Sequence, residues 1–155
     1  MVFVPEGFEP PTRHSVGDFR LEPLGVEHNE RDYAAWTSSM EHIRSMPGYP
    51  DGRWPRDMSL EENFNDLQRH ARDFTERKGF TFTVLDKTDD VVGCVYIYPC
   101  SDDKHDARVQ SWLRASKAAH EDAFRQGIAD WLTSKAWPFE NPLYEPLLGA
   151  DTGLV

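Results

Sequence analysis

The segment from Asp90 to Leu132 most constrains the fold, because two strand patterns and a helix pattern follow one another there with short connections. Residues 91–98 are a run of β-branched and aromatic residues, too apolar for a strand with one wetted face, and Pro99 ends it. Residues 108–114 form a second strand pattern, and a helical period begins at His120. The segment predicts a central strand, a second strand and a helix whose start can aim backbone N–H groups at a ligand.

The flanking segments predict further elements in a recognisable order. Residues 19–24 indicate a first strand, and residues 27–43 an amphipathic helix with a break near Ser38 and Ser39. Residues 46–58 are rich in proline and glycine and predict an irregular loop. A capping box of Ser59 and Glu62 begins a second helix, which Gly79 should end. Residues 80–84 pair with residues 91–98 as a hairpin, and a short last strand is possible near residues 143–144.

The order of these elements predicts an α/β (α+β) fold with a mixed, mainly antiparallel sheet and helices on both faces. We expect an N-terminal arm at residues 1–17, a single domain at 18–146 and a tail at 147–155. The aromatic residues of the arm leave two alternatives, a disordered segment or one that lies along the domain.

Composition excludes some classes of partner. The net charge is −10 and no window gathers lysine and arginine into a stripe, which argues against a nucleic acid partner. An acidic surface favours a cationic ligand such as an amine, although most acidic surfaces only keep a protein soluble. No segment has the length of a membrane span, and no signal-peptide pattern opens the chain, so we expect a cytoplasmic protein. Cys94 and Cys100 are expected to be reduced.

At this point the chain resembles the GCN5-related N-acetyltransferases, in which these elements occur in the same order. The resemblance covers residues 19 to about 144, and its most telling local piece is Trp112-Leu113-Arg114. This piece is similar to the end of the family's fourth strand, where exposed backbone groups receive the pantetheine arm of acyl-CoA. The resemblance implies an acetyl-CoA cofactor that binds at one continuous stretch of the chain, Trp112, Leu113, Arg114, Ser116 and Lys117.

The chain departs from the family in the phosphate-binding motif, Q/R-x-x-G-x-G/A. Placed by distance from the tryptophan, the motif falls on Ala118, Glu121 and Ala123, and only Ala123 fits. A side chain in place of the first glycine obstructs the approach of phosphate to the backbone, and an acidic one also repels it. Glu121 and Asp122 would instead complement the helix dipole themselves. These changes argue against binding of acetyl-CoA in the family's manner.

The acid and base groups of the family are also missing. Arg108 occupies the place of a fourth-strand glutamate that often helps as a base, and Asp106 flanks a loop. The later helix that often carries a tyrosine acid has no counterpart, and Tyr144 lies too early to inherit its role by position. The catalytic residues therefore stay unassigned. Acyl transfer depends strongly on positioning, so their absence does not exclude activity.

Aromatic residues and one arginine are the candidates for substrate binding, and they lie in the irregular loop and the central strand: Tyr49, Arg53, Trp54, Tyr96 and Tyr98. Each has a structural alternative, since Trp54 can simply fix the loop and buried tyrosines commonly pack under a helix. The acidic turn near Asp102 and His105 is more typical of a solvated loop than of a metal site, and we predict no metal.

Two hypotheses remain open. The first is an acyl-CoA-dependent N-acyltransferase that acts on a small amine, with residues 49–54 covering the substrate. The second is a non-catalytic ligand-binding or interaction protein on the same scaffold, which the missing glycines favour. A short sheet would also leave an exposed edge near Tyr144, from which we expect a homodimer.

Overall fold

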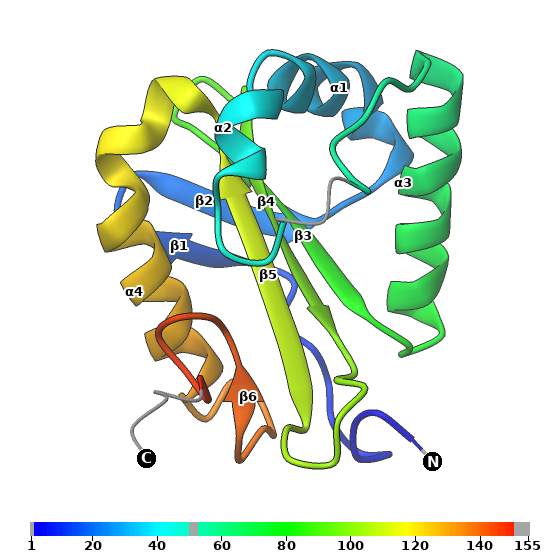
Figure 1. The fold of residues 1–155 in the computed structure, drawn as a ribbon. Coiled ribbons are helices and arrows are strands. Elements are labelled where there is room, and N and C mark those ends of the chain that lie inside the picture. The colour runs from blue at the N-terminus through cyan, green and yellow to red at the C-terminus, as the bar shows by residue number, and fades with distance from the viewer. Residues whose placement is uncertain (1, 50–52, 151–155) are drawn as a thin grey trace.

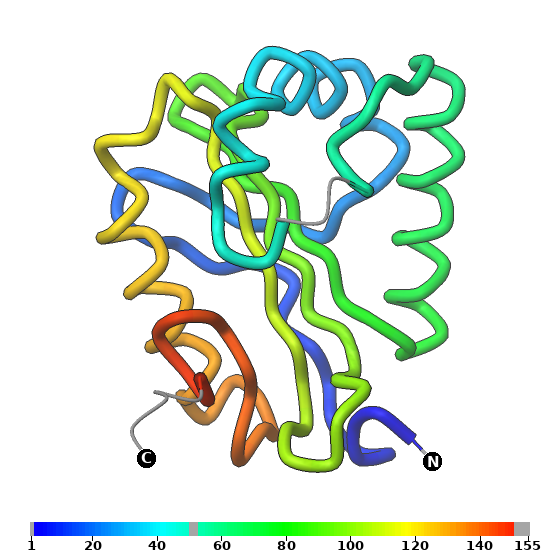
Figure 2. Tube along the Cα trace, in the orientation of Figure 1, coloured from blue at the N-terminus to red at the C-terminus, as the bar shows by residue number. Residues whose placement is uncertain are grey.

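The computed structural model describes residues 2–49 and 53–150, which form one sheet with helices packed on it (Figures 1 and 2). In these residues the sheet has six strands in sequential order: β1 (His14–Val16), β2 (Phe19–Pro23), β3 (Phe80–Leu85), β4 (Val91–Tyr98), β5 (Ala107–Leu113) and β6 (Pro142–Leu143). The α-helices are α1 (Asn29–Thr37), α2 (Met40–Arg44), α3 (Leu60–Thr75) and α4 (Glu121–Leu132). Short 3-10 turns occupy Val26–His28 and Ala115–His120.

The sheet is mixed and mainly antiparallel, which confirms the predicted fold class. The pairs from β1 to β5 are all antiparallel, whereas β5 and β6 run parallel. Because α4 lies between β5 and β6 in the chain, it supplies the crossover that a parallel pair requires. The 3-10 turn that precedes α4 was not predicted, since the helical period of the sequence begins only at His120.

Two hydrophobic clusters show that helices cover both faces of the sheet, as predicted. One cluster joins β2–β5 to α4 through Phe124, Ile128 and Leu132. The other joins the opposite face to α1, α2, α3 and the loop before α3. Side chains along β4 alternate between them, Val95 in the first and Cys94 in the second. Figure 1 shows α4 and α3 on opposite sides of the sheet.

The predicted start of α3 is confirmed, and its predicted end is wrong. The Ser59 hydroxyl accepts from the Glu62 N–H and the Glu62 carboxylate accepts from the Ser59 N–H, which confirms the capping box. The helix ends at Thr75 rather than at Gly79, because Arg77 takes the left-handed conformation (φ 62°) that ends it. Gly79 is needed for another reason: a Cβ there would collide with the Tyr98 ring.

The predicted break in the first helical segment is confirmed. α1 ends at Thr37 and α2 starts at Met40. The Thr37 and Ser38 hydroxyls donate to the carbonyls of Tyr33 and Ala35, in competition with the helical pattern.

The N-terminal arm lies along the domain, which decides between its two alternatives. Residues 14–16 of the arm form β1, and Val4 is 4% exposed. The Phe3 and Phe8 rings contact Phe80 with centroid separations of 5.9 and 6.4 Å. Arg77 also donates to two carbonyls of the arm. Residues 151–155 of the predicted tail, like residue 1, lie outside the described residues.

One edge of the sheet is β6, close to where an exposed edge was expected. It is short, because the chain turns back and the Tyr144 N–H donates to the Leu148 carbonyl at 2.9 Å. Across the described residues, no helix is long and apolar enough to cross a membrane.

Candidate functional site

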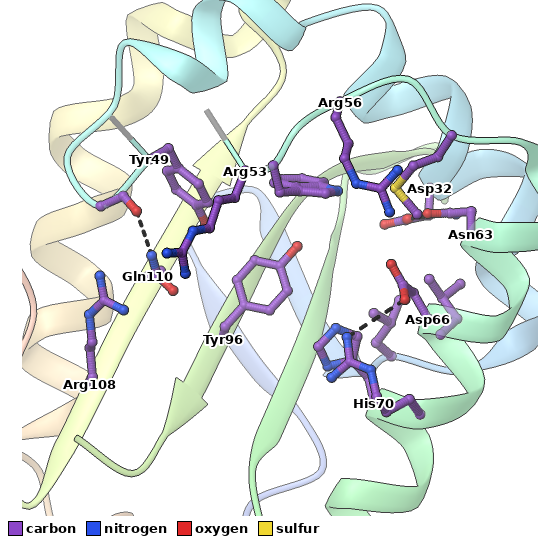
Figure 3. Close-up of a pocket in the computed structure, with 16 residues that line it drawn as sticks. Asp32, Tyr49, Arg53, Arg56, Asn63, Asp66, His70, Tyr96, Arg108 and Gln110 are labelled. Atoms are coloured by element: carbon purple, nitrogen blue, oxygen red, sulfur yellow. Dashed lines mark hydrogen bonds and ion pairs between the residues drawn. The ribbon is translucent and has the colours of Figure 1, made fainter. Parts of the chain in front are cut away.

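A pocket of about 410 Å³ opens on the face of the sheet opposite α4 (Figure 3). The loop after α2 forms its upper wall, α3 one side, and β4 and β5 its floor. Its lining combines aromatic, charged and apolar side chains: Leu24, Asp32, Gly48, Tyr49, Arg53, Trp54, Arg56, Met58, Asn63, Asp66, Leu67, Arg69, His70, Tyr96, Arg108 and Gln110. This mixture is typical of a site for a small polar ligand.

The structure brings the predicted substrate residues together. Tyr49, Arg53, Trp54 and Tyr96 line this pocket, and Tyr98 lines an adjoining one of about 230 Å³. They come from a loop and a strand that lie some forty positions apart in the sequence, so only the folded chain makes them neighbours.

Trp54 also holds the loop in place, which is the structural alternative to ligand binding. Its ring contacts four other aromatic rings with centroid separations of 5.4 to 6.4 Å: Trp36, Tyr49, Tyr96 and Trp112. The Gln110 amide adds a hydrogen bond of 2.6 Å to the Gly48 carbonyl. The described parts of the loop are thus held against β5, and the pocket has a fixed wall.

A buried polar network at the α3 side of the pocket was not predicted. Asn63, 3% exposed, donates to Asn29 at 2.9 Å and to Asp32 at 3.1 Å, and it accepts from the Trp36 indole N–H at 3.0 Å. Burial raises the pKa of Asp32 to about 6, although the hydrogen bond from Asn63 opposes this shift. The available signal was Asn63 itself, a polar residue three positions after Leu60 and four before Leu67 on the apolar face of the predicted helix.

His70 is a second residue that the sequence did not single out. Its Nδ1 lies 2.8 Å from the Tyr98 hydroxyl and 3.0 Å from that of Thr81, and Tyr98 donates onward to Asp73 at 2.8 Å. Burial is the main reason that the pKa of His70 falls to about 4. The imidazole in the pocket wall is therefore neutral at pH 7.

The residues predicted to bind the cofactor do not form one surface. Trp112 and Leu113 are 1% exposed, and the Trp112 indole donates to Tyr96 at 3.0 Å. Arg114 pairs with Asp90 at 3.2 Å. Ser116 is exposed in the 3-10 turn, and Lys117 lines a separate pocket of about 480 Å³ near the start of α4.

Side chains from other parts of the chain contact the later half of β5, the strand where the resemblance places the pantetheine arm. β6 pairs with β5 at Ala107 and Arg108, and no strand formed by the described residues pairs with the later half of β5 on that side. The Tyr144 and Ser111 hydroxyls are 2.7 Å apart there, and both residues are 1% exposed. Arg125 lies over the Tyr144 ring, 4.7 Å from its centroid, and donates to Ser111 at 3.4 Å.

The place of the phosphate motif does not fit the phosphates of CoA in the family's manner. Glu121, at the expected first glycine, is 8% exposed, and its carboxylate lies 2.8 Å from His42 Nε2. Asp122 adds a second carboxylate to the first turn of α4. A buried acidic side chain in place of a glycine leaves neither the close approach nor the charge that a pyrophosphate needs.

A small cluster of possible metal ligands lies away from the pocket. Cys100, Asp102 and His105 offer ligand atoms within 4.8 Å of one another. Both nitrogens of His105 already have protein partners, Asp102 at 2.8 Å and the Gly149 carbonyl at 2.8 Å. The hydrogen bonds to Asp102 and Gly149 raise the pKa of His105, so they favour an internal ion pair.

The comparisons with known proteins bear on the fold. No protein-family model matches the sequence, and no curated protein matches it. Among solved structures, the chain is similar to the ribosomal-protein-S5-alanine acetyltransferase from Vibrio fischeri, with a TM-score of 0.56 at 14% identity over 79% of this chain and 67% of that one. It is also similar to RimL, a ribosomal L7/L12 alpha-N-protein acetyltransferase (0.59; 13% identity; 83% and 68% of the two chains).

A third structure is that of the microcin C7 self immunity acetyltransferase MccE in complex with acetyl-CoA and AMP (TM-score 0.57; 16% identity; 82% and 70% of the two chains). A structure described as a GNAT-family acetyltransferase from Bordetella pertussis also matches, with a TM-score of 0.52. Agreement at such low identity, over four fifths of this chain, concerns the fold rather than the site. The chain has the fold of the GCN5-related N-acetyltransferases.

Proposed function

We propose that this chain transfers an acyl group from an acyl-CoA to a small amine that binds in the pocket between α3 and β5. The observation that carries the proposal is the position of this pocket. Arg108 and Gln110 line it from β5, and in the described part of the chain no strand pairs with the later half of β5 on the β6 side. Acceptor and donor would thus meet at a single strand, as acyl transfer requires.

The chain's own residues suit positioning better than proton transfer. Asp32 and His70 line the pocket, but the pKa of His70, about 4, makes it a weak base at neutral pH. An acceptor amine would therefore have to lose its proton before or during binding, and the rate would depend on orientation by the fixed aromatic wall.

The test is calorimetry with acetyl-CoA, with desulfo-CoA and free pantetheine for comparison, followed by an amine screen that detects the acylated product by mass. Micromolar binding that weakens in Ser116→Ala and Lys117→Ala, together with a product, would support the proposal. Absence of binding at millimolar acetyl-CoA would refute it.

A second candidate is a ligand-binding protein without transferase activity. The packing against β5 favours it, because Tyr144, Arg125 and Ser111 satisfy one another through hydrogen bonds and a cation–π contact. Acetyl-CoA binding by the Tyr144→Ala variant distinguishes the two candidates. If the wild type does not bind acetyl-CoA but the variant does, these side chains close the donor site. If neither binds, while small molecules still bind the pocket, the second candidate holds.

We propose separately that the chain forms a homodimer through the β6 edge. The short edge, with Leu148 turned back on Tyr144, offers few free backbone groups, so any dimer would depend mostly on side chains. Light scattering at working concentrations would test it, and a clean monomer would contradict it.

A further inference from the structure

The charge of the pocket is opposite to that of the chain. Among the described residues, four arginines line it, Arg53, Arg56, Arg69 and Arg108, against two carboxylates, Asp32 and Asp66. A positive pocket in a chain of net charge −10 needs a reason, because like charges in one concave site repel each other.

The four arginines come from three elements and surround the pocket. Figure 3 shows Arg53 and Arg108 on its β5 side and Arg56 toward α3. Arg69 is shared between Asp66 at 3.7 Å and Asp73 at 3.8 Å, distances too long for strong pairs.

Within residues 2–49 and 53–150, two of these arginines, Arg56 and Arg108, have no carboxylate at ion-pair distance. Arg56 donates to the Asp57 backbone carbonyl at 3.2 Å. In the part of the chain that the structure describes, the Arg108 side chain has no hydrogen bond or ion pair. Arginine is the side chain best suited to bind carboxylate and phosphate groups through paired N–H donors.

The deeper wall of the pocket adds an unused donor. The Tyr49 hydroxyl is buried and has no hydrogen-bond partner among the residues that the structure describes, and burial raises its pKa well above the usual value, so it keeps its proton. A buried hydroxyl without a partner is costly in a folded protein. A ligand oxygen in the pocket would give it an acceptor.

We propose that the pocket binds a small molecule with an anionic group, a carboxylate or a phosphate, held by Arg108 while its apolar body packs on Trp54 and Tyr96. The inference deepens the proposed function and rests on its pocket: the acceptor amine would itself carry the negative group. The overall acidity of the chain suggested a cationic ligand, and the pocket reverses that expectation locally.

The test is calorimetry with matched probes that share an amine and differ in the anion. Phenylalanine is compared with phenylalaninamide for the carboxylate, and O-phosphoethanolamine with ethanolamine for the phosphate. The anionic member of at least one pair should bind about tenfold tighter, since a charge-assisted pair contributes on that scale. Which pair responds distinguishes carboxylate from phosphate.

Variants locate the effect. Arg108→Gln should remove most of the tenfold preference, whereas Arg72→Gln, which removes a positive charge from α3 outside the pocket lining, should keep it. Circular dichroism confirms that each variant is folded. Equal binding of both members of each pair, absence of binding by all four probes at millimolar concentration, or an equal loss in Arg72→Gln would overturn the inference.

The test of anion binding does not depend on the test of acyl transfer, because binding is measured without an acyl donor. A preference for the anionic probes with no acylated product would refute the transferase and leave this inference intact. Acylation of the neutral and anionic probes at equal rates would do the reverse.

Discussion

The Tyr144 hydroxyl lies 2.7 Å from the Ser111 hydroxyl, so a residue just after β6 contacts the middle of β5 in a buried position. These two residues are 33 positions apart, and α4 lies between them in the chain. Arg125 of α4 completes the group, because it lies over the tyrosine ring and donates to the Glu145 carbonyl. The contact ties the end of the sheet to α4.

Loss of this hydrogen bond should be measurable without large repacking. Tyr144→Phe keeps the ring under Arg125 and removes only the hydroxyl, so we expect the free energy of unfolding to fall by about 1 kcal/mol. Urea denaturation of Tyr144→Phe, Ser111→Ala and the double variant gives the coupling between the two residues. Strictly additive effects would show that the hydroxyls do not interact.

The Asn63 network should be far more sensitive. Asn63→Ala leaves the Trp36 N–H without its acceptor and takes a donor from both Asn29 and Asp32, so we expect a loss of about 3 kcal/mol in the free energy of unfolding. Asn65→Ala is the matched control, because Asn65 is exposed on the same helix. The same helix-propensity gain applies to both changes. A loss at Asn63 no larger than that at Asn65 would contradict the network's role.

Asp32 should give the protein a distinctive dependence of stability on pH. Its pKa in the folded state, about 6, lies above the usual 3.8, so the folded state binds the proton more tightly than the unfolded state. This contribution is fully present below pH 3.8 and is lost as the pH rises through 6. Relative to Asp32→Asn, the wild type should lose about 2 to 3 kcal/mol between pH 3.5 and 7.5. If the free energy of unfolding changed with pH by the same amount in the two proteins, the raised pKa of Asp32 would be refuted.

The pKa of His70 should lie below the usual histidine value of 6.5, and the pKa of His105 should lie above it. Burial lowers the pKa of His70 to about 4, so its ring protons should shift only in acid. Hydrogen bonds to Asp102 and Gly149 raise the pKa of His105. NMR titration of the imidazole signals tests both, with His70→Gln and His105→Gln for assignment. A His70 midpoint near 6.5 would mean that the ring is solvated and that the pocket wall is open.

The lowered pKa of His70 should also change how the free energy of unfolding depends on pH. Because the folded pKa of His70 is lowered, its contribution is present above pH 6.5 and is lost as the pH falls toward 4. His70→Gln should therefore flatten the acid side of the stability profile. An unchanged profile would contradict the burial of this ring.

Much of the architecture could be predicted because local patterns specify it. The apolar run of β4, the alternation along β3 and the capping box at Ser59 depend on neighbours within a few residues, and each predicted element formed. Errors occurred at boundaries. There, a single residue such as Arg77 in a left-handed conformation ended a helix earlier than the glycine that the pattern favoured.

The site could be predicted only in part. Tyr49, Trp54 and Tyr96 stand out as aromatics in a loop and a strand, and they do line one pocket. Asp32 and His70 do not stand out, because their pKa values come from burial between elements that are distant in the chain. A local pattern contains no information on such burial.

The sequence by itself determined the type and order of the elements and the loss of the phosphate-binding glycines, because periodicity and residue identity are local properties. Only the tertiary structure decided that Tyr144 and Arg125 contact the later half of β5, and that four arginines of an acidic chain line one pocket among the described residues. The physical reason is that charge, burial and hydrogen bonding in a site depend on which distant segments the packed core brings together.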